Sequence, residues 1–468
     1  MVKKLESSMA RLPIRGDGEI KMNMKATGLT IGLAAVALLA LGPEARSQTT
    51  LKQSAQRAID GQPRLTVLRD NRQAIDQEYS RAWSLWYPQV DFRGEVGPEW
   101  SQNSSTNERG LLLARRGVGL TVQQRIFDGF EADSEITRQK KRSESAAMRV
   151  RETAEVLSLD AVQAHIDVYR QQALLELARK NIAFHEDILR RVRQRIARGV
   201  GTQADVNQVQ ARLDSALATE SETQGQLGEA IARYINIVGN EPDRLVPAES
   251  PSVPSAVDDL VNAARKENRT VAITEKDIEV ADAEVNAAEA PFYPKLSLEL
   301  GATRQFSQDG VRGPDHDFTA LLVLRYNLYK GGGDVAQKSV QLGRLSQAKS
   351  SMAVAVRAAE EEARRSNSLL LANIKRVEQL GSAVEQNRQV LDAYTKQFFE
   401  AGTRSLLDLL DAENELFVSQ SRLVNAEQTR IFAAYRLLST MGRLVPTLAL
   451  ALPQEADPGQ RPPKPPDR

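Results

Sequence analysis

The stretch Gly199-Val200-Gly201-Thr202-Gln203-Ala204-Asp205-Val206 has a counterpart 203 positions later, Gly402-Thr403-Arg404-Ser405-Leu406-Leu407-Asp408-Leu409. Two other landmarks are repeated at nearly the same distance, 206 and 202 positions: Tyr87-Pro88 with Tyr293-Pro294, and Phe127-Asp128-Gly129 with Tyr329-Lys330-Gly331. A unit of about 200 residues is far longer than the 20 to 50 residues of a solenoid repeat. The sequence therefore predicts a half-molecule that has been duplicated.

A long segment suited to a helix precedes each of the two glycine-containing stretches. Residues 132–196 contain neither proline nor glycine, and residues 335–401 contain no proline and only Gly343 and Gly381 as glycines. Apolar residues recur in the first segment at helical spacing. At 1.5 Å per residue, a helix of about 65 residues is roughly 100 Å long. Helices of this length are expected to pack side by side as a coiled coil.

Short runs with alternating apolar and polar residues lie between the helical segments. The apolar members are Val90, Phe92 and Val96; Val118, Leu120 and Val122; Leu296, Leu298 and Leu300; and Ala320, Leu322 and Leu324. Such runs of about ten residues are typical of outer-membrane barrel strands. Alternation alone equally fits soluble hairpins with one face packed on a core. Four strands cannot close a barrel, and open edges in lipid leave backbone groups unpaired, so a membrane form requires oligomerisation. Three copies would supply twelve strands.

Composition at the ends and in the middle of the chain suggests its boundaries. Residues 1–47 are expected to be a signal peptide, because the apolar run Gly28–Leu41 is too short to cross a bilayer; an uncleaved anchor is the alternative, and Met22 or Met24 are possible starts. The first repeat is placed at 48–240 and the second at 257–444, joined by a proline-containing linker at 241–256. Each repeat is expected to contain a helix, a hairpin (88–127 or 294–329), a long helix, a turn and a helix. A proline-rich tail, 445–468, is expected to be disordered.

Composition also excludes several classes of function. The 62 basic and 61 acidic residues nearly balance, so nothing indicates nucleic acid as a partner. The chain has no cysteine, which excludes disulfides, thiolate metal sites and a catalytic thiol. The three histidines are not spaced for a metal site, and no serine elbow or phosphate loop is present. We therefore expect neither an enzyme nor a bound cofactor.

With its repeat, its two Tyr-Pro hairpins and the stretch Ala401–Ala412, the chain resembles the TolC family of outer-membrane channel-tunnels. The resemblance covers nearly the whole mature chain. It implies an α+β membrane protein, mostly α, that is one subunit of a homotrimer. In such a trimer a twelve-stranded barrel in outer-membrane lipid continues into a long α-helical tunnel in the periplasm. A periplasmic adaptor (membrane fusion) protein and an inner-membrane ABC or other export pump are the implied partners.

The repeated stretches supply the candidate site residues. Thr202-x-x-Asp205 and Ser405-x-x-Asp408 resemble capping boxes, whereas Asp411 has no capping role, and its repeat counterpart is Gln208. The resemblance assigns Asp408 and Asp411 to a periplasmic gate, Arg404 to a latch and Phe399 to its aromatic neighbour. An exposed i,i+4 pair of Arg404 with Asp408, worth under about 1 kcal/mol, is the alternative. The expected tip turns, which would dock the adaptor, contain Gly199, Gly201, Thr202, Asp205, Gly402, Thr403 and Ser405.

The sequence thus predicts the exit duct of a tripartite export system. Type I protein secretion is favoured, because residues 173–218 resemble secretion-associated relatives and no cysteine is present for N-terminal lipidation. A duct for drug or small-molecule efflux is an alternative. A soluble periplasmic coiled-coil scaffold is a second alternative, from a different class of protein.

Overall fold

The computed structural model describes residues 48–107 and 109–460. The expected signal peptide and residues 461–468 of the expected tail lie outside this part. The first half contains α1 (Leu51–Gly61), α2 (Pro63–Trp83), β1 (Gln89–Ser101), β2 (Leu111–Phe127), α3 (Glu131–Ala197) and α4 (Gln203–Val238). The second half repeats that order with α5 (Val257–Glu267), α6 (Arg269–Glu289), β3 (Lys295–Phe306), β4 (Pro314–Arg325), α7 (Gly333–Lys396) and α8 (Leu406–Thr440). The duplicated, mostly helical architecture with four strands is confirmed.

Two helices, rather than the single expected helix, precede each hairpin. In the first half Gln62 is extended, and Pro63 begins α2, where its missing N–H is not needed. In the second half the Asn268 side chain accepts hydrogen bonds from the backbone of Thr270 and Val271 and so starts a new helix. Local chemistry therefore breaks both segments at equivalent positions, which helical periodicity alone does not reveal.

The four strands form one antiparallel sheet in the order β1-β2-β3-β4. Its register places Phe92 opposite Leu120, Leu120 opposite Ala302 and Ala302 opposite Phe318. Because alternate residues point to opposite faces, this register gathers the apolar set of each strand on one face. The outer edges of β1 and β4 have no strand partner within the described chain.

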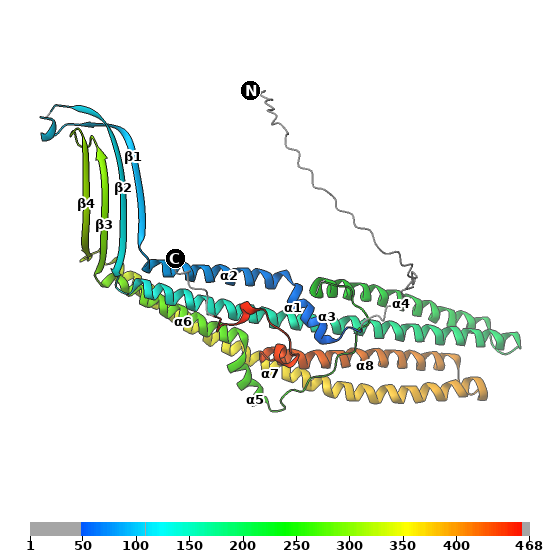
Figure 1. Cartoon of the computed structure of the whole chain (residues 1–468). Coiled ribbons are helices and arrows are strands. Elements are labelled where there is room, and N and C mark those ends of the chain that lie inside the picture. The colour runs from blue at the N-terminus through cyan, green and yellow to red at the C-terminus, as the bar shows by residue number, and fades with distance from the viewer. Residues whose placement is uncertain (1–47, 108, 461–468) are drawn as a thin grey trace, which may run out of the picture. The chain divides into compact units, whose positions relative to one another are not determined.

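The long helices extend from this sheet, with the turns of the α3–α4 and α7–α8 hairpins at their other end (Figure 1). Helix α3 has 67 residues and α7 has 64. Small residues on α3, such as Ala147, Ala154, Ala161 and Ala164, are completely buried and allow the helices to approach closely. None of the described helices is both long and apolar enough to cross a membrane.

A buried polar network holds α1, α3, α4 and the linker between the halves together. The carbonyl of Val246 can only accept, so the His165 Nε2–H donates to it at 2.8 Å. Nδ1 of His165 therefore accepts from the Ser54 hydroxyl at 2.9 Å, and Ser54 in turn accepts from the Tyr234 hydroxyl at 2.8 Å. Burial lowers the pKa of His165, so the imidazole stays neutral.

The chain from 445 to 460 is ordered, so the expectation of a disordered tail is wrong for these residues. Val445, Leu450 and Ala456 are buried in the core formed by α1, α3 and α4. The Arg69 guanidinium pairs with Glu455 at 3.2 Å, and Gln56 bonds both the N–H and the C=O of residue 451. Proline-rich composition obscured the three spaced apolar side chains that anchor this segment. It ties the end of the second half to the first.

Candidate functional site

The first tip turn joins α3 to α4 through two glycines with positive φ. Gly199 has φ of +80° and Gly201 +118°, conformations that side chains with a Cβ rarely adopt. Thr202 then caps α4: its hydroxyl accepts from the Asp205 N–H, and the Asp205 carboxylate accepts from the Thr202 N–H at 2.8 Å. The capping box expected from the sequence is present.

The second tip turn, between α7 and α8, has the same kind of cap, but the helix before it ends differently. The last turn of α7 widens into a π-helix at Gln397–Ala401 and ends at Gly402, whose φ is +66°. The Thr403 N–H donates to the Gln397 carbonyl at 3.1 Å. Ser405 and Asp408 then form the reciprocal capping box of α8. Asp408 therefore has a structural role as part of a helix cap, independent of any role in a pore.

Arg404 lies against the end of α7 more closely than against Asp408. Its Nη1 is 3.9 Å from the Asp408 carboxylate, whereas its Nε donates to Gln397 Oε1 at 3.0 Å. The guanidinium also lies 4.4 Å from the ring centroid of Tyr394. The i,i+4 pair is present but long, and the amide and the ring hold the arginine.

Asp411 has a partner that the sequence analysis did not find. Arg212 of α4 donates to its carboxylate, Nη2 to Oδ1, at 2.9 Å. The two residues are 199 positions apart and belong to different halves, so no local spacing could have indicated the pair. The contact joins the α3–α4 hairpin to the α7–α8 hairpin near their tips. Both side chains are partly exposed, Arg212 at 40% and Asp411 at 56%.

Phe399 packs against α3 together with Phe398. The two rings meet edge to face at 4.8 Å. The Arg191 guanidinium lies 4.1 Å from the Phe399 centroid, and that of Arg195 lies 4.5 Å from the Phe398 centroid. Arg195 also donates to the Phe398 carbonyl at 3.1 Å. These contacts clamp the π-helical turn of the second half onto α3 of the first.

A compact apolar cluster contributed by α3, α4, α7 and α8 supports the tip. Ile188, Val209, Leu409 and Leu410 are fully or almost fully buried there. Two titratable groups lie in the same region. Burial raises the pKa of Glu413 to about 7. Burial, together with the nearby Arg212 charge, lowers the pKa of His185, so its imidazole is largely neutral near neutral pH, whereas the Glu413 carboxyl is only partly protonated there.

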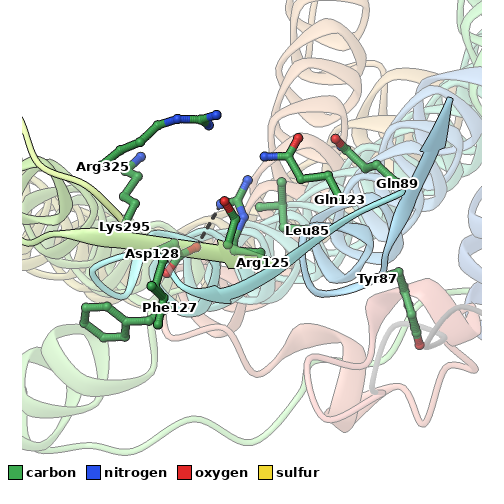
Figure 2. A pocket seen from close by; sticks show the side chains of 11 residues that line it. Leu85, Tyr87, Gln89, Gln123, Arg125, Phe127, Asp128, Lys295 and Arg325 are labelled. Atoms are coloured by element: carbon green, nitrogen blue, oxygen red, sulfur yellow. Dashed lines mark hydrogen bonds and ion pairs between the residues drawn. The ribbon is translucent and has the colours of Figure 1, made fainter. Parts of the chain in front are cut away.

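A hollow of about 190 Å³ at the junction of sheet and helices is the other candidate site (Figure 2). Its cations are Arg125, Lys295 and Arg325. Arg125 pairs with Asp128 at 2.8 Å, Lys295 with Glu131, and Arg325 with Glu299 at 2.7 Å. Asp128 also accepts from the first backbone N–H groups of α3. Because each cation is paired with a carboxylate of the chain, these ion pairs stabilise the junction of sheet and helices and leave no free cation among the described residues of the hollow for an anionic ligand.

A four-stranded sheet with two strands from each half, together with one long helical hairpin in each half, defines the TolC-like channel fold. The family model described as "Outer membrane efflux protein" matches residues 54–240 and 260–443. The chain belongs to this family, whose members are channel proteins of the outer membrane. The family match favours the duct over the periplasmic scaffold.

Individual relatives share a low sequence identity with the chain, but the alignments cover most of both proteins. The chain is 26% identical to the outer membrane efflux protein BepC of Brucella suis over 79% of this chain and 80% of BepC. It is 23% identical to the alkaline protease secretion protein AprF of Pseudomonas aeruginosa over 81% and 82%. A solved structure of the outer-membrane channel OprN matches with a TM-score of 0.73 and 19% identity over 84% of this chain and 89% of OprN.

Proposed function

We propose that the chain is one subunit of a trimeric exit duct, which conducts substrates across the outer membrane and the adjoining periplasm. The observation that carries the proposal is the placement of sheet and tips at opposite ends of the helices (Figure 1). A helix of 67 residues is roughly 100 Å long. If the sheet lies in the outer membrane, the tips reach deep into the periplasm, where an inner-membrane pump can meet them.

The unpaired edges of the sheet support the trimer. Backbone N–H and C=O groups on the outer edges of β1 and β4 would be left without partners in lipid, at a cost of several kcal/mol for each group. Pairing β4 of one copy with β1 of the next satisfies both edges. Three copies close a twelve-stranded barrel, which is within the range of known outer-membrane barrels.

The tip contacts support a gate. In a threefold assembly Asp408 and Asp411 each occur three times around one axis, where close carboxylates repel one another and attract cations. The pairing of Arg212 with Asp411 opposes that repulsion and holds α8 against α4. Movement of the α7–α8 hairpin away from α3–α4 breaks this pair. Such movement also breaks the clamp at Phe399, while Arg404 moves with α7.

Docking of a periplasmic adaptor is assigned to the two tip turns. Gly199, Gly201, Thr202, Gly402, Thr403 and Ser405 are exposed. The capping aspartates Asp205 and Asp408 stiffen both turns from within. A rigid, exposed pair of helix turns presents a defined shape to a partner helix hairpin.

Within export, we propose type I protein secretion, with an ABC or other export pump in the inner membrane. The extensive likeness to AprF, which is named for secretion of a protease, supports this choice. The likeness to BepC, named as an efflux protein, supports drug or small-molecule efflux as the second candidate. A strain lacking the chain separates them: loss of a secreted protein from the medium supports secretion, and increased drug sensitivity with unchanged secretion supports efflux.

The duct itself is tested with the purified protein. Its mass in detergent is expected to be that of three chains, and it is expected to give small, cation-selective steps in a planar bilayer. A monomeric species without conductance would contradict the proposal.

A further inference from the structure

The two faces of the sheet differ in charge. Apart from the end of β2, where the register shifts between Arg125 and Phe127, residues with even numbers in all four strands share one face, here called the apolar face. Odd-numbered residues share the other face, here called the odd face. A Cβ added to Gly117 would touch the side chains of Glu95 and Gln305, which shows that odd-numbered residues of three strands lie together. All carboxylates of the strands lie on that odd face: Asp91, Glu95, Glu99, Glu299, Asp315 and Asp317.

Cations on the odd face are paired. Arg115 contacts Glu95 at 2.7 Å and Glu99 at 3.0 Å, and Arg93 contacts Glu95 at 3.0 Å. The apolar face carries two arginines of its own, Arg116 and Arg304, and no carboxylate within the four strands. Both are exposed, and neither forms an ion pair among the described residues. The two guanidinium groups thus have no carboxylate partner on their own face among the described strand residues.

The two arginines are diagonal neighbours in the register. Arg116 of β2 lies opposite Phe306 of β3, and Arg304 of β3 lies opposite Val118 of β2. Diagonal partners have Cα atoms roughly 7–8 Å apart, within reach of one bridging group for long side chains. A hollow of about 530 Å³ is lined by both arginines together with Val96, Phe306 and Glu95, whose carboxylate is already paired with Arg93 and Arg115. The Arg304 guanidinium also lies 5.1 Å from the Phe306 ring centroid.

Their position along the strands indicates the kind of anion. The rows nearer the helices are apolar on this face, such as Val90, Val122, Leu300 and Ala320. The arginines lie toward the far end of the sheet, where β1 ends at Ser101 and β3 ends at Phe306. Trp100 follows them on the same face with 63% exposure. Tryptophan marks the border between hydrocarbon and headgroups in barrels, and lipid-facing arginine is tolerated best near that border.

We propose that Arg116 and Arg304 together bind the phosphate of an outer-leaflet lipid, whose acyl chains lie along the apolar rows nearer the helices. Guanidinium groups bind phosphate through paired, charge-assisted hydrogen bonds. Closure of a trimer through the edges of β1 and β4 leaves this face toward lipid. The inference rests on the proposed function, because that function places the loops outside and the helices in the periplasm.

The test uses Trp100 as a local reporter. The chain has three tryptophans, so the variant Trp83→Phe with Trp86→Phe leaves Trp100 alone. The full chain is placed in phosphatidylcholine vesicles that contain either brominated phosphatidate, which has a phosphate monoester, or brominated phosphatidylcholine. Quenching of Trp100 by phosphatidate is expected to exceed quenching by phosphatidylcholine, with an enrichment of roughly fivefold for each arginine.

Arginine variants and inorganic phosphate as a competitor show whether the two arginines and a lipid phosphate cause the enrichment. Arg116→Gln with Arg304→Gln is expected to abolish the enrichment, Arg116→Lys with Arg304→Lys to reduce it, and Arg93→Gln on the odd face to leave it intact. Millimolar inorganic phosphate is expected to leave it intact as well, because a free ion has no acyl chains. Equal quenching by the two lipids, enrichment that survives the double glutamine variant, or loss of enrichment in inorganic phosphate would overturn the proposal. Absence of quenching by either lipid would instead contradict the proposed membrane duct.

Discussion

Replacing Arg212 by glutamine tests whether the two hairpins are tied at the tip. The substitution removes the 2.9 Å contact with Asp411 and leaves a shorter, uncharged polar side chain. With both side chains more than a third exposed, one such pair contributes about 0.5 kcal/mol, the middle of the range of about 0–1 kcal/mol for exposed pairs. Three pairs in a trimer give a central value of about 1.5 kcal/mol, or a roughly tenfold shift of the closed-to-open equilibrium.

The assay is the fraction of time that single channels spend in a larger conductance state. Arg212→Gln is expected to raise the open-to-closed ratio by roughly tenfold. Arg193→Gln is the matched control, because Arg193 is an exposed arginine on α3 without an ion-pair partner among the described residues. Arg212→Gln and Asp411→Asn should not be additive, since each removes the same contact.

Two outcomes would refute this reasoning. One is an open fraction for Arg212→Gln equal to that of the Arg193→Gln control. The other is strict additivity of the Arg212 and Asp411 substitutions, which would mean that the two side chains do not act as a pair. An independent readout comes from His185: the Arg212 charge helps to lower its pKa, so NMR titration of Arg212→Gln is expected to show a higher pKa for His185.

Three further predictions concern stability. Burial raises the pKa of Glu413 to about 7, so the folded state keeps a proton that the unfolded chain loses near pH 4.5. The free energy of unfolding therefore falls as the pH rises from 4.5 through 7. Glu413→Gln is expected to raise the melting temperature at pH 8, where it adds at most about 3 kcal/mol to the free energy of unfolding, and to leave it unchanged at pH 4. The pKa of His165 is lowered, so its contribution to stability is complete above about pH 6.5 and declines below it. His165→Gln is expected to lower the melting temperature at pH 8 and to weaken the fall of the melting temperature as the pH drops below 6.5. An unchanged fall at low pH would count against the network. In thermal melts, Gly402→Ala is expected to destabilise the protein by about 1–2 kcal/mol, because φ at this position is +66°. Gly343→Ala within α7 is expected to stabilise the protein by about 0.5–1 kcal/mol. Equal effects of the two substitutions would contradict the turn geometry.

Features with local causes could be predicted from the sequence. The four strands and the two capping boxes depend on residues close together in the chain, and the duplication shows directly in stretches repeated about 200 positions apart. The long helices follow from the absence of proline over more than sixty residues. The breaks before α2 and α6 are also local, but they depend on single residues, Pro63 and Asn268, within otherwise helical segments.

Contacts between the halves could not be predicted in this way. The pairing of Arg212 with Asp411 and the stacking of Arg191 on Phe399 join residues about 200 positions apart, and no periodicity specifies which helix faces meet. The ordered segment after Leu444 was missed for a related reason. Its stability comes from apolar side chains such as Leu450 inserted into a distant core, and composition averages over those few residues.

The most direct test of the central claim is conductance before and after labelling of a single thiol at the tip. The chain has no cysteine, so Asp411→Cys introduces a unique reactive group. We predict that a bulky thiol reagent added from the tip side reduces the single-channel conductance of this variant and leaves the cysteine-free parent unchanged. Conductance of a fully labelled Asp411→Cys channel equal to that before labelling would show that the current does not pass this position, and would contradict a duct gated at its helical tip.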